Sequence, residues 1–134
     1  MKWLLDTNTL NYLFREDAMV RGHFDKTRAD PNNIFVLSPM VDYEFRRYMV
    51  LKNARRNLAQ YEALAQHWLR PGFLDDDWHL AVNLWAERHR AGLPIDDADL
   101  LIAVTALRQN AVLVTSNTRH FANLGLILAD WWQA

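Results

Sequence analysis

Four oxygen-bearing side chains stand where apolar runs of the sequence begin or end. Asp6 closes "KWLL", Glu44 lies shortly after "SPMV", Asp99 precedes "LLIAV", and Asn117 lies shortly after "AVLVT". Carboxylates that share one cleft repel one another, so one or more would protonate unless a cation neutralised them. Mg²⁺ and Mn²⁺ prefer oxygen ligands, and a bound ion lowers the pKa of its water and polarises a phosphodiester. If the four residues meet, their types predict metal-assisted hydrolysis.

Strands and helices that alternate along the chain would hold these residues. Short apolar runs predict strands at residues 2–7, 34–39, 111–117 and 124–131. Apolar residues at helical spacing predict helices at residues 8–17, 40–69, 75–92 and 97–110. The second of these is long enough to be one long helix or a helical pair. Asn110 is expected to end the last helix in the left-handed conformation.

This alternation favours the α/β class, as a three-layer α/β/α sandwich with a mainly parallel central sheet. A chain of 134 residues is expected to form a single domain, over residues 1–134. Ligands of such sheets bind beyond the carboxyl ends of the strands, where helices antiparallel to the strands begin. Asp6 and Asn117 follow strands, and Glu44 and Asp99 lie near helix starts. Topology therefore predicts that all four meet on one rim.

The composition narrows the class of protein. A formal net charge of -1 with 23% charged residues gives no global basic field, so nucleic-acid binding would require a local patch. The chain has no cysteine, which excludes disulfides, thiolate zinc sites and cysteine nucleophiles. Asp6 interrupts the first apolar run, which makes a poor signal peptide, and no apolar stretch approaches the roughly 20 residues of a membrane helix. We expect a soluble, cytoplasmic protein.

Three acids crowd the start of the last predicted helix. Acids at a helix start cap free backbone N–H groups and suit the positive end of the macrodipole, which is a purely structural explanation. Asp96 is expected to be the N-cap, with at most an outer role in the site, and Asp97 to be solvated. Asp99 occupies the position of a capping-box acid, but Asp is shorter than the Glu or Gln that reaches back to the cap. Because the topology turns it toward Asp6 and Glu44, Asp99 is the candidate for the metal site.

Four motifs taken together resemble the PIN-domain family. They are "LLDTN" at residues 4–8, "SPMVDYEFRR" at 38–47, "DADLLIAVTA" at 97–106 and "LVTSNTRHF" at 113–121. More narrowly, they resemble the VapC toxins of type II toxin–antitoxin pairs. The resemblance implies an Mg²⁺- or Mn²⁺-dependent endoribonuclease, which is a hydrolase acting on RNA phosphodiester bonds. It also implies a cognate antitoxin as protein partner, and a homodimer.

The resemblance assigns catalytic roles to four positions. Asp6 and Asp99 match the principal metal-binding carboxylates, and Glu44 matches the third acid of the site. Asn117 matches a fourth position at which such families often have Asp. An Asn there supplies a neutral ligand or a group that positions water, which weakens the case for a second tightly held ion. Whether one or two ions bind stays open.

Several neighbouring residues are candidates for auxiliary roles. The hydroxyls of Thr7, Thr115 and Ser116 adjoin the predicted rim and suit a water or a phosphate, while Arg47, Arg119 and His120 are candidates for RNA contact. The three basic residues also have structural explanations, because Arg47 at i+3 would pair with Glu44 and residues 119–120 would form a surface turn. The basic run at residues 46–56 points around its helix, so it favours a solvated face over an RNA track.

Other functions are compatible with parts of the pattern. The same nuclease fold would serve RNA processing without a toxin role. A third alternative is a phosphoacceptor or other non-catalytic α/β interaction module. A phosphoacceptor domain requires a paired acid on the first strand and a lysine late in the chain, whereas the last lysine here is Lys52, so the sequence disfavours it. In a purely structural role, Asp6 would cap a helix and Asn117 would be a turn residue. Trp78 and Trp85 are expected to pack, in the core or in a dimer.

Overall fold

The central sheet consists of four parallel strands. The computed structural model describes residues 1–132 of the chain. Its strands are β1 (Lys2–Leu5), β2 (Ile34–Val36), β3 (Val112–Val114) and β4 (Leu128–Ala129), in the spatial order β2-β1-β3-β4. Trp3 of β1 pairs with Phe35 on one side and with Val112 on the other. The predicted parallel α/β class is confirmed, and each of the four predicted strands is present but shorter than predicted.

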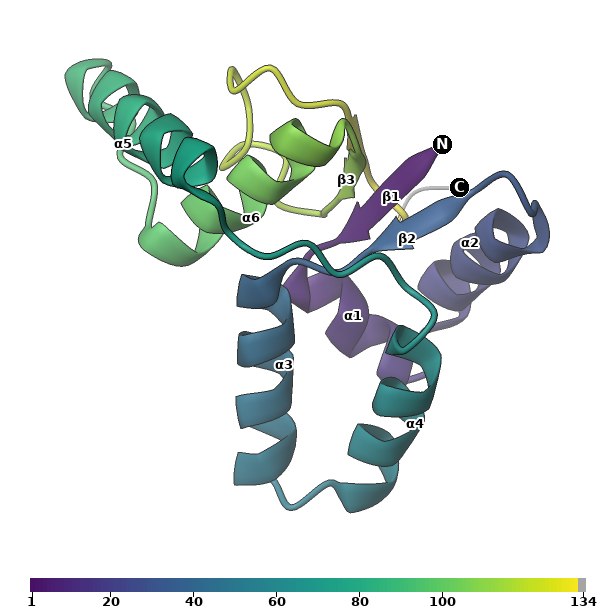
Figure 1. The fold of residues 1–134 in the computed structure, drawn as a ribbon. Coiled ribbons are helices and arrows are strands. Elements are labelled where there is room, and N and C mark those ends of the chain that lie inside the picture. The colour runs from purple at the N-terminus through teal and green to yellow at the C-terminus, as the bar shows by residue number, and fades with distance from the viewer. Residues whose placement is uncertain (133–134) are drawn as a thin grey trace.

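Helices surround this sheet (Figure 1). They are α1 (Thr7–Phe14), α2 (Ala18–Ala29), α3 (Pro39–Leu51), α4 (Arg55–Ala65), α5 (Asp75–Arg90) and α6 (Asp97–Gln109). The long predicted segment is a helical pair, because the chain turns between α3 and α4 at Asn53, which has a φ of 56°. Helix α2 was not predicted, since it buries only Val20 and Phe24 and its apolar periodicity is weak. Asn110 ends α6 in the left-handed conformation, as predicted.

The order of the strands explains where the helices lie. The chain passes from β1 to β2 through α1 and α2, and then crosses back beyond β1 to β3 through the other four helices. Crossovers between parallel strands are right-handed, so two crossovers in opposite directions run over opposite faces of the sheet. The start of the second crossover is an exception, because α3 and α4 pack against α1 through Phe14, Phe45 and Tyr61. In Figure 1, α5 and α6 lie on one side of the strands and α1 and α2 on the other. The arrowhead of β1 points toward the starts of α1 and α3.

Helix α6 is packed in the core, and side-chain hydrogen bonds join α3 to α4. Residues 102–106 of α6 are all buried, as expected of a helix that is apolar nearly all round. On α3, Asp42 accepts hydrogen bonds from Arg46 Nε at 2.7 Å and from the Tyr61 hydroxyl of α4 at 2.5 Å. Trp131, near the end of the described chain, is buried in the core. None of the helices in residues 1–132 is long and apolar enough to cross a membrane.

Candidate functional site

Three of the predicted acids meet at the carboxyl edge of the sheet. Asp6 directly follows β1, and its backbone N–H donates to the Val114 carbonyl of β3 at 3.1 Å. Glu44 lies in the first half of α3, and Asp99 lies in the first turn of α6. Asp6 interacts electrostatically with both Glu44 and Asp99. Asp6 is therefore the centre of an acidic cluster that consists of Asp6, Glu44 and Asp99.

Asp6 is a buried carboxylate that also caps α1. Its side chain accepts hydrogen bonds on Oδ1 from the Thr9 backbone N–H at 2.8 Å and from Thr9 Oγ1 at 2.7 Å. Burial raises the pKa of Asp6 above its ordinary value, hydrogen bonds from Thr115 and Thr9 lower it, and the charge of Glu44 raises it. The structural explanation of Asp6 as a helix cap is thus true. A buried acid with a raised pKa among other acids is also typical of a functional site.

Glu44 is positioned by two neighbours. Thr7 Oγ1 donates to Glu44 Oε1 at 2.7 Å, and the Arg47 guanidinium lies 3.8 Å from Oε2. The predicted pair of Glu44 with Arg47 is therefore present, but it is long, and Arg47 also lies over the Tyr43 ring at 4.8 Å. Thr7 adjoins the site as predicted. Its hydroxyl is engaged by Glu44, so it orients this carboxylate.

Asp99 lies between Asp96 and His120. Asp96 is the N-cap of α6, as predicted, since its Oδ1 accepts from the Asp99 backbone N–H at 2.9 Å. The Asp99 carboxylate is directed to His120, with Oδ2 at 3.3 Å from Nδ1. Burial raises the pKa of Asp99, the charge of Asp96 raises it further, the contact with His120 lowers it, and the charge of Asp6 raises it. Asp96 therefore influences the site through Asp99.

The loop after β3 carries the other predicted residues. Thr115 is buried, hydrogen bonds to Asp6, and accepts the Asn117 backbone N–H on its Oγ1 at 2.9 Å. Ser116 and Asn117 are exposed. Within residues 1–132, no hydrogen bond or ion pair joins the Asn117 side chain to the acidic cluster. The structure thus brings Thr115 to the acids and leaves Asn117 at the edge of the site.

The basic residues divide between this site and the solvent. His120 contacts Asp99, and Arg119 lines the same cavity as Asp99. In the basic run at residues 46–56, Arg46 pairs with Asp42 and with Glu62 of α4, whereas Lys52 contacts the hydroxyl of Tyr48. These cations engage different partners around the α3–α4 pair, so they do not form one basic stripe.

The donor set of the acidic cluster fits a hard divalent cation. In the part of the chain that the structure describes, no three acid or histidine side chains form a ready-made metal centre. Mg²⁺ does not require one, because it keeps several waters and commonly binds through one or two carboxylates. Asp6 and Asp99 repel each other, and each has a raised pKa. A cation would relieve this repulsion, and a set of oxygen donors suits Mg²⁺ or Mn²⁺.

Two residues of this region were missed by sequence reasoning. Thr9 is fully buried and holds the Asp6 carboxylate, and its position three residues after a helix cap was the available signal. Arg88, in the last turn of α5, is 8% exposed and donates to the carbonyl oxygens of Leu93, Ala122 and His120. Nothing in the sequence distinguishes Arg88 from the other cations of α5.

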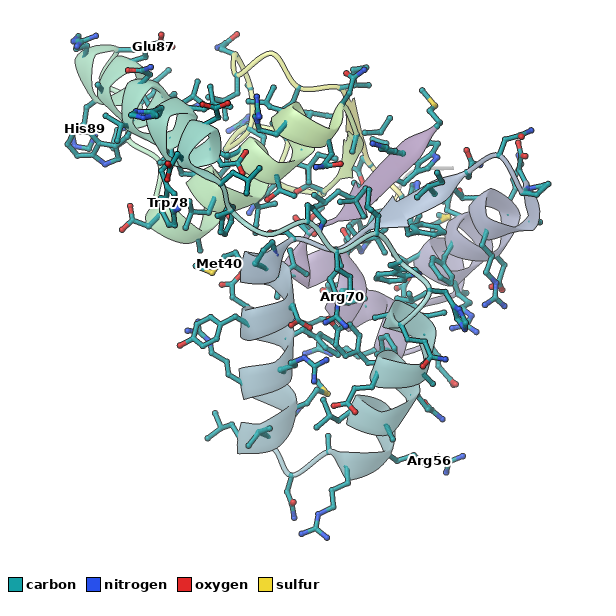
Figure 2. The ribbon with its side chains drawn as sticks, in the orientation of Figure 1. Met40, Arg56, Arg70, Trp78, Glu87 and His89 are labelled. Atoms are coloured by element: carbon teal, nitrogen blue, oxygen red, sulfur yellow. The ribbon has the colours of Figure 1, made fainter. Side chains whose placement is uncertain are left out.

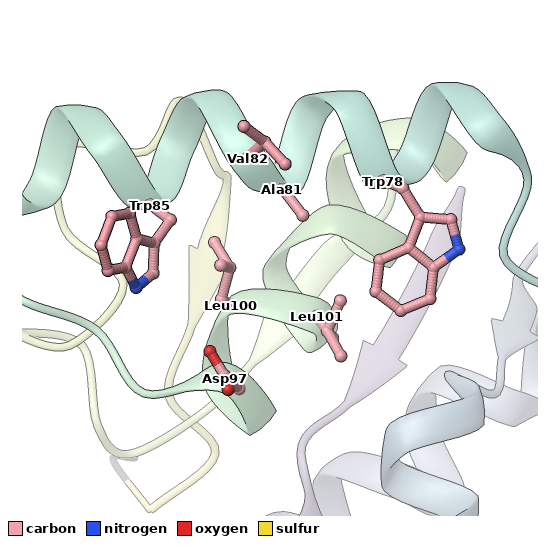
Figure 3. Close-up of a pocket in the computed structure, with 7 residues that line it drawn as sticks. All are labelled: Trp78, Ala81, Val82, Trp85, Asp97, Leu100 and Leu101. Atoms are coloured by element: carbon pink, nitrogen blue, oxygen red, sulfur yellow. The ribbon is translucent and has the colours of Figure 1, made fainter.

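Two cavities flank the start of α6. The larger, of about 330 Å³, lies between α5 and α6 (Figure 3). Its lining is apolar except for Asp97, and consists of Trp78, Ala81, Val82, Trp85, Asp97, Leu100 and Leu101. The smaller, of about 290 Å³, is lined by charged residues that include Asp96, Asp99, Arg119 and His120. Of the acidic cluster, Asp99 borders the smaller cavity.

Known proteins resemble this chain over almost its whole length. A family model described as PIN domain matches residues 3–126. The "tRNA(fMet)-specific endonuclease VapC" of Shigella flexneri is 28% identical over 98% of this chain and 98% of its own, and the protein of that name from Salmonella typhimurium is equally similar, at 28%. In the solved structure of VapBC2 from Rickettsia felis bound to a promoter DNA fragment, one chain is 26% identical, with a TM-score of 0.86 over 98% of this chain and 99% of that one. A chain of DNA-bound VapBC from Salmonella typhimurium is 25% identical, with a TM-score of 0.81 over 98% of each.

Proposed function

The chain belongs to the PIN-domain family, and on that premise we propose that it is a divalent-metal-dependent endoribonuclease, a hydrolase of RNA phosphodiester bonds. The observation that carries this proposal is the acidic cluster, whose members come from three separate elements and meet at the carboxyl edge of a parallel sheet. The two similar VapC proteins are named as endonucleases, which supports the same activity.

We assign Asp6 and Asp99 as the carboxylates that hold Mg²⁺ or Mn²⁺, with Glu44 as the third acid of the site. A bound ion of this kind supplies a water of lowered pKa and neutralises charge on the phosphodiester. Thr9 orients the Asp6 carboxylate through two hydrogen bonds. Thr7 orients Glu44 in the same way. Such supporting hydrogen bonds keep ligands in place before an ion arrives.

The exposed residues of the rim are assigned to the substrate. Asn117 is neutral and separate from the three acids, so its amide suits a water or a phosphate oxygen, and this favours a single tightly held ion. Ser116 exposes a hydroxyl beside it. Arg47 and Arg119 bring positive charge to the rim and His120 adds a ring nitrogen, and contacts of these groups to the RNA backbone would fix its position.

We further propose that the chain is the toxin of a type II toxin–antitoxin pair, as a single PIN domain that acts in the cytoplasm on RNA there. The chains of solved VapBC complexes that it resembles are matched over 98% of this chain. Similarity of this extent supports a cognate antitoxin as the protein partner.

An exposed apolar face of α5 supports a homodimer. Trp78, Val82 and Trp85 are 50%, 66% and 44% exposed, and the Trp85 ring stacks on His89 at 3.9 Å between centroids. Figure 2 shows Trp78 and His89 on the same side of α5. The first turn of α5 is acidic and its last turn is basic. A two-fold axis across α5 would set each acidic end against the basic end of the partner, so the face is complementary to itself.

Sequencing of RNA 5′ ends after induced expression tests the proposed function. The wild type is expected to arrest growth and to produce new ends at discrete sites, and Asp99→Asn is expected to do neither. Calorimetric titration with Mn²⁺ should show binding that Asp99→Asn loses. Undiminished RNA cleavage by purified Asp6→Asn and Asp99→Asn would defeat the assignment. Cleavage without growth arrest would keep the nuclease and favour a role in RNA processing.

A further inference from the structure

A cavity lined by both charged and apolar residues adjoins the acidic cluster on the side of Asp99. It has a volume of about 290 Å³ and lies between the loop that joins α5 to α6 and the loop that follows β3. Residues 92–95 form one wall, with Leu93 half exposed, and Arg119 and His120 form the other. This volume is near the lower end of the range for small-ligand pockets.

Arg88 joins the two walls of this cavity. Its Nε donates to the Leu93 carbonyl at 2.7 Å on one wall, and its terminal nitrogens donate to Ala122 and His120 carbonyls at 2.8 and 3.2 Å on the other. Among the residues that the structure describes, no ion pair includes Arg88. Its buried charge is therefore satisfied by backbone carbonyl oxygens, and this holds the two walls at a fixed separation.

We propose that this cavity is a nucleotide subsite, which seats the base of the RNA residue next to the scissile phosphodiester, and that Arg88 is the positioning residue that holds its walls together. The inference rests on the proposed nuclease function, because the cavity shares Asp99 with the acidic cluster. A base in this cavity places its own phosphate beside the acids.

The lining of the cavity has the mixture of groups that a nucleotide requires. Leu93 and Pro94 offer apolar contact to the face of a base, and Asp96 with the backbone of the loop offers hydrogen bonds to its edge. Arg119 and His120 on the opposite wall attract the phosphate. The cavity between α5 and α6 lacks this mixture, since its lining is apolar apart from Asp97.

Removal of single bases from the substrate tests the subsite. The probe is a labelled oligoribonucleotide that the wild type cleaves at one mapped bond with Mn²⁺, together with versions in which each nucleotide near that bond is replaced by an abasic ribose. We expect one abasic position beside the bond to lower kcat/KM of the wild type about 10-fold, as for a lost stacking contact.

A cavity-filling variant links that base to the cavity. Leu93→Trp fills the cavity from an exposed loop residue, so it should raise KM about 10-fold on the complete RNA and have no further effect on the sensitive abasic substrate. The matched control is Leu51→Trp, at a residue that is 83% exposed at the end of α3. It should cleave every substrate as the wild type does.

Arg88→Lys tests the positioning role separately. It keeps the charge but loses the planar fork that reaches both walls, so KM should rise while kcat and Mn²⁺ affinity stay within about twofold. A parallel loss of kcat and Mn²⁺ affinity would indicate general loosening and overturn the positioning role.

Other outcomes overturn the subsite. A Leu93→Trp penalty that is equal on every abasic substrate removes the subsite and leaves the nuclease function intact, whereas a wild type that cleaves no RNA removes both. If Leu93→Trp cleaves as the wild type does but escapes inhibition by a partner protein, the cavity binds protein instead and the nucleotide subsite is wrong.

Discussion

The two cavities beside α6 are close in size but differ in chemistry. The cavity between α5 and α6 has a volume of about 330 Å³ and an apolar lining except for Asp97, and the cavity near the loop after β3 has about 290 Å³ and a lining that mixes charged and apolar residues. Asp97 borders the first cavity, whereas Asp99, two residues later, borders the second. Residues two apart on an α-helix point roughly 200° apart. The direction of each acid around α6 therefore decides which cavity it serves.

The proposed active site adjoins the smaller of these two cavities, so size alone would select the other one. The larger cavity has no cluster of acids, and its exposed tryptophans suit association with another copy of the chain. The smaller cavity is bordered by Asp99, whose pKa is raised by burial and by the charges of Asp96 and Asp6. An acid with a perturbed pKa is a better guide to a functional site than the volume of an apolar cavity. We therefore propose separate roles for the two sides of α6, and separate substitutions should remove each role.

The largest expected effect separates the two acids of α6. Asp99→Asn should reduce metal-dependent RNA cleavage by at least about 100-fold, because it removes a charged ligand of the reacting centre. Asp97→Asn, on the apolar side, is the matched control and should stay within about twofold. Cleavage rates with Mn²⁺ on one RNA substrate measure both. Equal losses of cleavage rate in the two variants would show that the two sides of α6 do not have separate roles.

A charge in the centre of the exposed apolar face of α5 should weaken the proposed homodimer. Val82→Glu should raise the dissociation constant of the homodimer about 30-fold, because two like charges would face each other across the two-fold axis. Asn83→Glu, at the next exposed residue of α5, should leave the constant unchanged. Analytical ultracentrifugation over a concentration series measures both variants. A dimer that tolerates Val82→Glu would place the interface elsewhere.

The acidic cluster should destabilise the folded protein when no metal is bound. Burial raises the pKa of Asp6, so the folded chain holds this proton more tightly than the unfolded chain does. Stability should therefore fall as the pH rises from the ordinary value of 3.8 through the raised pKa of the folded state. With EDTA present, Asp6→Asn should increase Tm by a few degrees at pH 7, because it removes the buried charge while Asn still caps the helix. The increase should become smaller toward pH 4, where Asp6 of the wild type is itself protonated in the folded state. Calorimetry at several pH values measures Tm. The control Glu87→Gln, on the exposed surface of α5, should show no such trend. A lower Tm for Asp6→Asn than for the wild type at pH 7 would contradict the proposed loss of stability.

The smallest expected effect concerns the rim cations. Arg119→Ala should weaken RNA binding about threefold and lower the slope of log K against log salt by about 1, as expected for one lost phosphate contact. Arg56→Ala, at the exposed start of α4, should change neither quantity. Fluorescence titrations at several salt concentrations, in Ca²⁺ or without metal to prevent cleavage, measure both. Equal effects of the two substitutions would favour a diffuse basic surface over a local patch.

Much of the fold could be predicted because its signals are local. Short apolar runs predicted the strands, apolar spacing predicted most helices, and the residue type of Asn110 predicted the left-handed end of α6. Helix α2 escaped because a helix that buries only two residues leaves little periodicity. The convergence of Asp6, Glu44 and Asp99 also followed from the sequence, since parallel strands and the helices after them share one edge of the sheet.

The sequence by itself determined the fold class, the three acids and the cap at Asp96, because these depend on residue type, periodicity and a general rule of topology. Only the tertiary structure decided that His120 contacts Asp99, that Asn117 lies apart from the acids, and that Arg88 joins two loops. Such contacts link residues far apart in the sequence through side-chain direction and loop geometry. Neither of these leaves a periodic signal in the order of the residues.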